Sequence, residues 1–120
     1  MENSFKFWEK YEFDTSDGKR ATVKFVTTNF KADANVWVTW VVRNIGEGVL
    51  GHANLGKGVV EVAIGSYACD GSFQLLDVDT VEYVMTHELG HSIGLTHSTN
   101  VDNIMYDVVP HAGYAFCLLN

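Results

Sequence analysis

Three histidines and a glutamate stand at fixed intervals in residues 86–98, THELGHSIGLTHS. His87 and His91 are four residues apart, so on a helix both imidazoles project from one face and can bind one zinc ion at about 2.0–2.1 Å. Glu88 lies about 100° further around the helix. There it can accept a proton from a metal-activated water molecule without being a ligand itself. This combination of residues predicts hydrolytic chemistry.

Gly94 and His97 extend the pattern beyond the helix. Glycine permits the sharp turn that ends a helix, and the chain can then return to offer His97 as a third ligand. Three protein ligands leave one position open for water, which is the layout of a catalytic zinc site. The full HExxHxxGxxH pattern has a chance occurrence on the order of one in ten million per position. Three unrelated histidines and a solvated helix glutamate are the alternatives.

The segments around this motif predict a single α+β domain over residues 1–120. Residues 4–11 have helical periodicity, and residues 65–76 look irregular. Strands are expected over residues 21–30, 35–42, 49–55 and 59–64. The second helix should start at Asp79 as N-cap, with Glu82 completing a capping box, and end near Gly94. We expect a twisted, mixed sheet of four to five strands, packed on the N-terminal helix and the histidine-bearing helix.

Composition narrows the class of partner. Hydrophobic residues make up 47% of the 120 residues and charged residues 19%, which is typical of a globular chain. The formal net charge of -7 argues against nucleic acid, because phosphate binding needs clustered Lys and Arg. No apolar run or basic amphipathic stretch favours a membrane. The start is too polar for a signal peptide, and no patch argues for a dimer, so we expect a monomer.

The zinc motif resembles that of the metzincin peptidases, in which a Met-turn follows the third ligand. Met105, within NIMY at residues 103–106, is similar to the methionine that forms an apolar floor beneath the metal in that group, although ordinary core packing would also explain it. Ser98, and the segments ADANVWVTW (32–40) and VLGHA (49–53), resemble the matrixins, the group of the matrix metalloproteinases. The resemblance implies a metzincin-like zincin fold, a short irregular C-terminal subdomain and zinc-dependent endopeptidase activity on proteins or peptides.

The same resemblance implies where a substrate would bind. Residues 49–55 would be an edge strand that pairs with an extended peptide, and residues 108–114 would form a wall of the pocket beside the zinc. We therefore expect cleavage before an apolar residue. The substrate-binding residues implied in this way are Leu50, Gly51, His52, Ala53, Pro110 and Tyr114.

The chain also departs from the matrixin pattern. Matrix metalloproteinases carry a structural zinc and calcium ions on a long loop before the edge strand, whereas here the connection, residues 43–50, is short. His52 lacks its partner histidine near residues 60–62, so we expect one catalytic zinc and no structural zinc. Calcium could use Asp70, Asp77 or Asp79, but turn and cap roles explain these carboxylates.

Cys69 and Cys117 leave three interpretations. The resemblance favours a disulfide, and with it an extracellular or secreted location; two free thiols, or a Cys117 thiolate blocking the zinc, are the alternatives. The first strand and the C-terminal helix of the family, and its inhibitory cysteine motif, are missing, so we expect a minimal or truncated form. The alternative function is a latent or inactive zinc-stabilised binding module with its C-terminal tail over the cleft.

Overall fold

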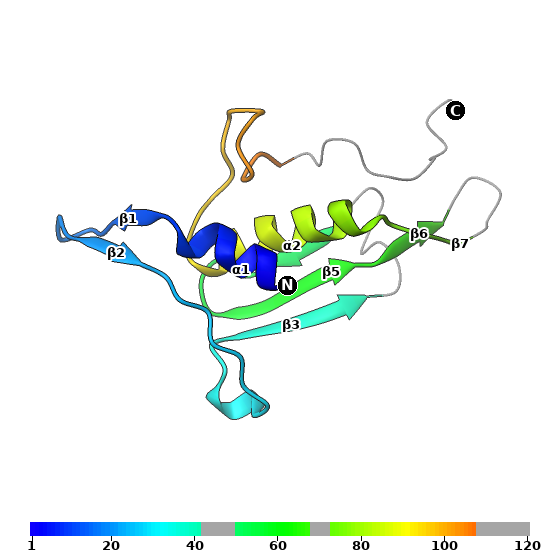
Figure 1. Cartoon of the computed structure of the whole chain (residues 1–120), viewed down its shortest axis with the longest axis horizontal. Helices are drawn as coiled ribbons and strands as arrows, with labels where there is room; N and C mark the ends of the chain where they lie inside the picture. Colours follow the sequence, from blue (N-terminus) through cyan, green and yellow to red (C-terminus); the bar gives the residue numbers. More distant parts are fainter. Residues whose placement is uncertain (42–49, 68–72, 108–120) are drawn as a thin grey trace.

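The computed structural model describes residues 1–41, 50–67 and 73–107. Helix α2 packs on strands β4 and β5 of the central sheet, and helix α1 lies beside α2 (Figure 1). The α+β prediction, with an N-terminal helix and a histidine-bearing helix, is confirmed. In chain order the elements are α1 (Glu2–Glu9), β1 (Glu12–Asp14), β2 (Arg20–Thr22), the 3-10 helix η1 (Lys31–Asp33), β3 (Val36–Val41), β4 (Gly51–Ala53), β5 (Gly58–Ala63), β6 (Gly65–Tyr67), β7 (Phe73–Leu75) and α2 (Val78–Ser92).

The central sheet is mixed, as expected. Its strand order is β3-β5-β4, with β3 parallel and β4 antiparallel to β5. In β5 the side chains of Val60 and Val62 are fully buried, and they pack with Val84, Met85 and Leu89 in one hydrophobic core. The alternation of side chains along a strand explains why every second residue of β5 points at α2.

Among the described residues this sheet has three strands, fewer than the four to five expected. The remaining strands form two separate antiparallel pairs, β1–β2 and β6–β7. The expected strand over residues 21–30 ends at Thr22, because the chain beyond it is held by α1. The backbone N–H of Phe25 donates to the Glu9 carboxylate (2.8 Å), and the Phe25 ring stacks on Phe5 with centroids 4.8 Å apart. Residues 65–76, expected to be irregular, contain β6 and β7.

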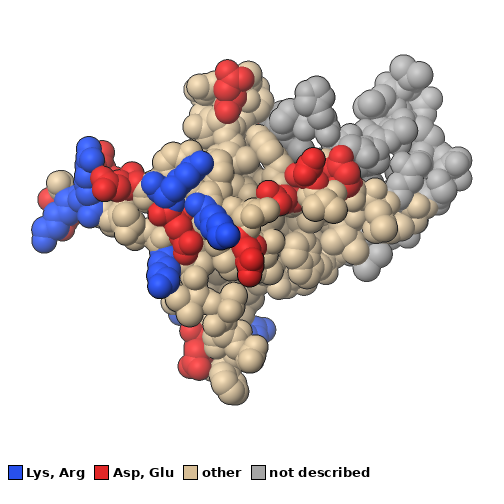
Figure 2. Space-filling view, viewed as in Figure 1, with Lys and Arg blue, Asp and Glu red and all other residues tan. Residues whose placement is uncertain are grey.

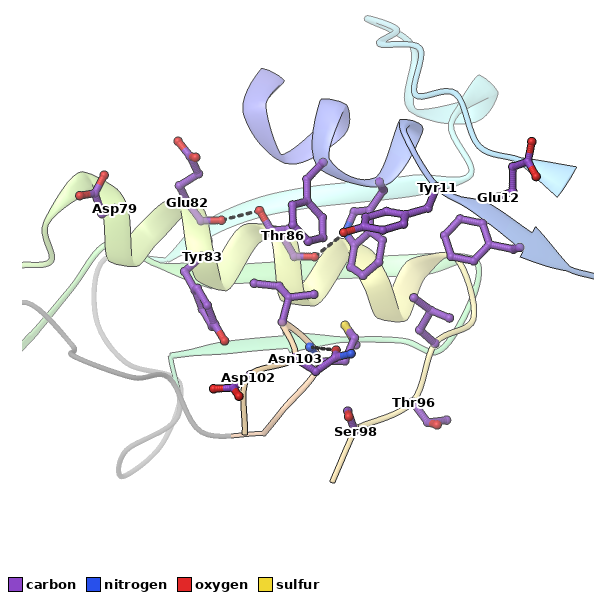
Figure 3. A pocket seen from close by; sticks show the side chains of 16 residues that line it. Tyr11, Glu12, Asp79, Glu82, Tyr83, Thr86, Thr96, Ser98, Asp102 and Asn103 are labelled. Atoms are coloured by element: carbon purple, nitrogen blue, oxygen red, sulfur yellow. Dashed lines mark hydrogen bonds between the residues drawn. The ribbon is translucent and has the colours of Figure 1, made fainter. Parts of the chain in front are cut away.

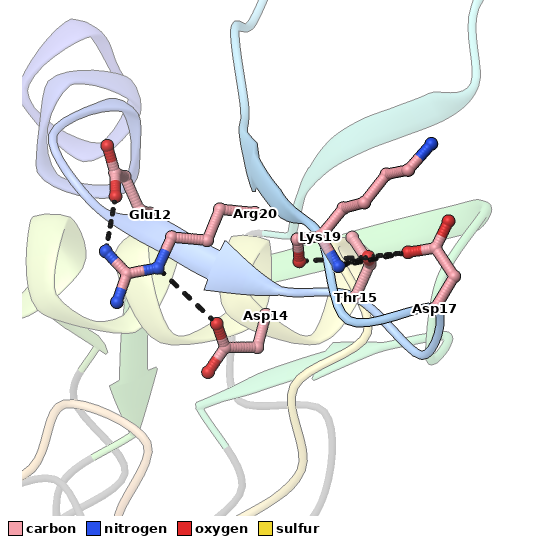
Figure 4. A network of polar contacts seen from close by, with 6 residues as sticks. All are labelled: Glu12, Asp14, Thr15, Asp17, Lys19 and Arg20. Atoms are coloured by element: carbon pink, nitrogen blue, oxygen red, sulfur yellow. Dashed lines mark hydrogen bonds and ion pairs between the residues drawn. The ribbon is translucent and has the colours of Figure 1, made fainter.

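The β1–β2 hairpin projects from the domain (Figure 1), and polar contacts join its two strands (Figure 4). The Arg20 guanidinium lies 3.0 Å from the Glu12 carboxylate and 3.7 Å from that of Asp14. All three side chains are mostly exposed, so these ion pairs contribute little to stability. Gly18 has φ +81°, which lets the turn close without the strain of a Cβ.

The interface between the two helices is polar at one end and aromatic at the other. The buried hydroxyl of Thr86 donates to Ser4 Oγ (2.7 Å), and the indole N–H of Trp8 donates to the carbonyl of Thr86 (2.7 Å). Trp8 is 4% exposed. These bonds satisfy groups that would otherwise be buried without partners, and they fix the position of α1 along α2.

The start of α2 differs from the prediction. The N-cap is Asp77, whose carboxylate accepts a hydrogen bond from the backbone N–H of Thr80 at 2.8 Å. Asp79 lies inside the first turn, and the Glu82 carboxylate accepts from the Asn3 amide (3.2 Å). The sequence offers two aspartates two residues apart, and capping at Asp77 leaves Asp79 in the first turn, where the helix dipole favours a negative charge.

No helix in residues 1–41, 50–67 or 73–107 combines the length and apolar character needed to cross a membrane.

The two aspartates allow a matched test of the cap. Asp77→Ala should lower the Tm by about 3–6 °C, because the Thr80 N–H loses its partner, while Asp79→Ala should change it less. Hydrogen bonding to Thr80 holds the pKa of Asp77 below its ordinary value of 3.8, so the difference in Tm between Asp77→Ala and wild type should be full above about pH 4 and shrink as the pH falls below about 3.8. Thermal unfolding curves, monitored by circular dichroism at several pH values, give the Tm of wild type and of both variants. A larger loss for Asp79→Ala would place the cap at Asp79.

Candidate metal centre

The structure brings His87, His91 and His97 together. Each offers a ring nitrogen, and these atoms all lie within 4.8 Å of one another. The Nε2 atoms of His91 and His97 are 3.2 Å apart. Two ligands bound at 2.0–2.1 Å in a tetrahedral site would lie about 3.3–3.4 Å apart. The cluster therefore has the dimensions of a zinc site.

Backbone carbonyls orient two of the three rings. Nδ1 of His87 lies 2.7 Å from the carbonyl oxygen of Ile104, and Nδ1 of His91 lies 2.7 Å from that of Leu95. A carbonyl can only accept, so in each ring Nδ1 carries the proton and Nε2 presents a lone pair. Such partners of the second ring nitrogen are typical of metal-ligating histidines.

The end of α2 and the following loop place His97 opposite the helix. Gly94 has φ +100°, the left-handed conformation of a helix terminus, and its N–H donates to the His91 carbonyl (2.9 Å). The Leu95 N–H donates back to the Gly90 carbonyl (3.0 Å). Gly94 therefore ends the helix with a sharp turn, as the sequence predicts, and the chain turns back toward α2.

Met105 lies in a tight loop that is bonded to the His97 segment. The N–H of Ser98 donates to the Met105 carbonyl (2.9 Å), and the side-chain oxygen of Asn103 accepts from the Met105 N–H (2.8 Å). Met105 is 4% exposed. A Cβ on Gly90 would collide with the Met105 sulfur and lie 2.7 Å from the Trp8 ring. The absence of a side chain at Gly90 thus allows Met105 to pack against α2 next to His91, a predicted ligand. The role of Met105 as an apolar floor beneath the metal stays a prediction.

Glu88 is buried beside the histidines. It is 4% exposed, its Oε1 lies 3.8 Å from His87 Nε2, and its Oε2 has no hydrogen-bond partner. Burial raises the pKa of Glu88 to about 7. Strand β4 lies against Glu88. Its residue Gly51 is so close that an added Cβ would come within 2.9 Å of the Glu88 side chain. A carboxylate without partners is costly to bury, and a nearby cation would offset that cost, so Glu88 also fits a metal site.

Burial also acts on the histidines. Desolvation lowers the pKa of His87. The hydrogen bond to the Ile104 carbonyl raises it by a smaller amount, and the neighbouring His91 and His97 lower it further. The neutral ring is therefore favoured down to more acidic pH than usual, and neutral imidazole is the form that binds metal.

The predicted substrate-binding residues divide into two groups. Gly51, His52 and Ala53 form β4, which pairs with β5 along one edge only among the described residues. Leu50 is buried in the core, with its carbonyl bonded to Ala63 N–H at 2.9 Å. The others, Pro110 and Tyr114, lie outside the described residues, as do Cys69, Cys117 and Asp70.

His52 lies apart from the predicted zinc ligands. It is exposed and faces Glu61 in the β4–β5 register. In the part of the chain that the structure describes, the three clustered histidines are the one group of potential metal ligands found. Asp77 is occupied as a helix cap.

The sequence did not identify the groups that hold the site together. The rings of His91 and His87 are oriented by the backbone carbonyls of Leu95 and Ile104. Every residue has a backbone carbonyl, so the residue types at these two positions did not point to this role. The closeness of Gly51 to Glu88 depends on how β4 crosses α2, which spacing along the chain does not report.

The family model Peptidase_M10, described as Matrixin, matches residues 1–116 of this chain. The chain belongs to the matrixin family. Matrix metalloproteinase-B of Caenorhabditis elegans is 26% identical over 133 aligned residues, which cover 88% of this chain and 25% of the relative. The chain thus spans about a quarter of that relative's length. Matrixins are metalloproteases, and the family implies zinc and usually secretion.

The buried Glu88 predicts a pH dependence of the metal-free protein. Its pKa is raised from 4.5 to about 7 in the folded state, so its favourable contribution is present below 4.5 and is lost as the pH rises through about 7. With a chelator present, the Tm of Glu88→Gln minus that of wild type should grow between about pH 4.5 and pH 7 and level off above that. Differential scanning calorimetry checks this, with Glu82→Gln as the control for an amide in the same helix. A pH-independent difference would contradict it.

Proposed function

We propose that this matrixin is a zinc-dependent endopeptidase that hydrolyses peptide bonds in proteins or peptides. The observation that carries the proposal is the pairing of three converging histidines with a buried carboxylate, Glu88, whose Oε2 has no hydrogen-bond partner. His87, His91 and His97 would hold the ion. When bound, zinc supplies Lewis-acid activation of a water molecule and of the scissile carbonyl.

Glu88 would move the proton. Its pKa of about 7 lies near neutral pH, where a group can both accept and release a proton. The carboxylate would take the proton from the attacking water and deliver it to the leaving amine. The partnerless Oε2 is free for this, because no hydrogen bond within the described protein has to break first.

Strand β4 would bind the substrate. Its inner edge pairs with β5, and its other edge has no strand partner within the described residues. An extended peptide can add to such an edge through main-chain hydrogen bonds, which give affinity without reading the sequence. Gly51 lies directly over Glu88, so a peptide along β4 would pass next to the proposed base.

The charges on the surface fit a protein substrate better than nucleic acid. Figure 2 shows acidic side chains interspersed with the Lys and Arg that lie over α1 and the β1–β2 hairpin. No broad basic patch forms on the described part of this face, and the chain carries a net charge of -7. Phosphate backbones need such patches.

Metal content tests the ligand set. His97→Ala should lose most of its zinc on dialysis, because two ligands bind far more weakly than three, whereas His52→Ala should keep one zinc per chain. Atomic absorption on the dialysed proteins measures both. Full zinc in His97→Ala would remove that residue from the set, and two zinc ions in wild type with one in His52→Ala would establish a structural site.

Cleavage of a quenched, unfolded protein tests the base. Glu88→Ala should keep its zinc and lose about 10²–10⁴-fold in kcat, whereas Glu82→Ala, on another face of α2, should remain active. Wild-type cleavage by Glu88→Ala would refute the assignment. Zinc without cleavage in wild type would favour the latent or binding module.

A further inference from the structure

The last turn of α2 is hydrogen-bonded to the turn that joins β4 to β5. This β4–β5 turn, residues 54–57, places the backbone N–H of Gly56 2.8 Å from the carbonyl oxygen of His91. Within the described part of the chain, no other backbone hydrogen bond joins the sheet or its turns to residues 89–92. The bond therefore connects a predicted metal ligand to the end of the strand that would bind substrate.

The carbonyl of His91 lies where a helix lacks donors of its own. The last four carbonyls of an α-helix have no N–H partner within the helix, and helix ends fray. The Gly94 N–H also donates to the His91 carbonyl (2.9 Å), and the Leu95 N–H donates to the Gly90 carbonyl (3.0 Å). These two donors belong to the segment that follows the helix and would move with it. Gly56 is the donor that fixes this end of the helix relative to the sheet.

The middle of α2 is held by α1 instead. The carbonyl of Thr86 accepts a hydrogen bond from the Trp8 indole N–H at 2.7 Å (Figure 3), and the Thr86 hydroxyl donates to Ser4 Oγ at 2.7 Å. Thr86 lies more than one turn before the helix ends at Ser92. These bonds fix the course of the helix, but they leave the carbonyl of His91 to the β4–β5 turn.

Strand β4 is joined to α2 near both of its ends. Its first residue, Gly51, lies against the Glu88 side chain, and Gly56 follows three residues after its last residue, Ala53. Glu88 and His91 are three residues apart, which is about one helical turn. Contacts at two such points fix the distance and the direction between the strand and the metal-binding face of the helix.

Three hydrogen bonds hold the β4–β5 turn itself. The Asn54 side chain accepts from the Val59 N–H (2.8 Å), the Asn54 N–H donates to the Val59 carbonyl (3.0 Å), and the Gly58 N–H donates to the Asn35 carbonyl (3.0 Å). Gly56 has φ +85°, in the left-handed region that favours glycine. Nothing lies within 4 Å of a Cβ built on Gly56, so a substitution there acts through the backbone and the direction of its N–H.

We propose that Gly56 is a positioning residue of the metal centre, whose N–H holds the His91 carbonyl and so couples metal binding to the order of the β4–β5 turn. The inference rests on the proposed function, which places zinc at the three histidines and substrate on β4. Coupling between two sites is reciprocal. A displaced turn therefore weakens metal binding, and a bound metal ion makes the turn harder to open.

Zinc affinity of the full chain tests the coupling. Gly56→Ala should raise the Kd for zinc at least about tenfold, as loss of a group that supports a metal ligand does. Gly56→Asn should raise it less than about threefold, because asparagine tolerates a positive φ. Competition with a chromophoric chelator measures each Kd.

Gly18→Ala is the matched control. Gly18 has φ +81°, nothing lies within 4 Å of a Cβ built on it, and it lies in the β1–β2 hairpin. Its substitution imposes the same backbone strain outside the contacts of α2, so the Kd for zinc should stay that of wild type.

Amide exchange on the unmodified chain gives an independent measurement if Gly56→Ala fails to fold. Zinc should slow the exchange of the Gly56 N–H at least about tenfold, because opening of the turn would have to displace a bound ligand residue. The Gly18 N–H, which donates to the Thr15 carbonyl in its own turn (3.1 Å), should exchange at the same rate with and without zinc. Nuclear magnetic resonance resolves both amides.

Four results would overturn the inference. The first is a wild-type Kd in Gly56→Ala. The second is equal weakening by Gly56→Ala and Gly18→Ala, which would reflect a general loss of stability. The third is equal weakening by Gly56→Ala and Gly56→Asn, which would blame the added side chain, and the fourth is zinc-independent exchange at Gly56. Zinc binding without peptide cleavage would count against the proposed function and leave this inference standing.

Discussion

The close approach of α2 to its neighbours is the constraint on which the rest of the structure depends. Two glycines permit it, because Gly51 lets β4 lie against Val84 and Glu88, and Gly90 lets Met105 and Trp8 reach the helix. With both sides of the helix in contact, α2 has little freedom to shift or rotate. The direction of its histidines is therefore fixed by packing before any metal binds.

This packing has an electrostatic cost. Glu88 is taken out of water without a hydrogen bond for Oε2, and burial raises its pKa to about 7. The Nε2 atoms of His91 and His97 lie 3.2 Å apart. A cation bound beside them would offset the cost of burying the Glu88 carboxylate, so metal binding would stabilise the folded protein.

The loop after α2 is bonded to two of the predicted metal ligands or their neighbours. Ser98 and Met105 are joined by a backbone hydrogen bond, and Ile104 orients His87 through its carbonyl. A change in the packing of this loop would therefore reach two of the predicted ligands, His87 directly and His97 through Ser98.

The sequence alone predicted the three histidine ligands, Glu88 as the base and the α+β fold class, because histidine spacing and hydrophobic periodicity are local properties of the chain. The structure confirms the fold class, and the roles of the histidines and of Glu88 stay predictions. The prediction of Asp79 as the cap of α2 was wrong, because the carboxylate of Asp77 accepts the hydrogen bond from the Thr80 N–H and the helix starts two residues earlier. The course of residues 23–30 depended on contacts with Glu9 and Phe5 that sequence spacing does not report. The raised pKa of Glu88 and the tautomer of His87 arise where segments distant in sequence meet, so only the tertiary structure decided them.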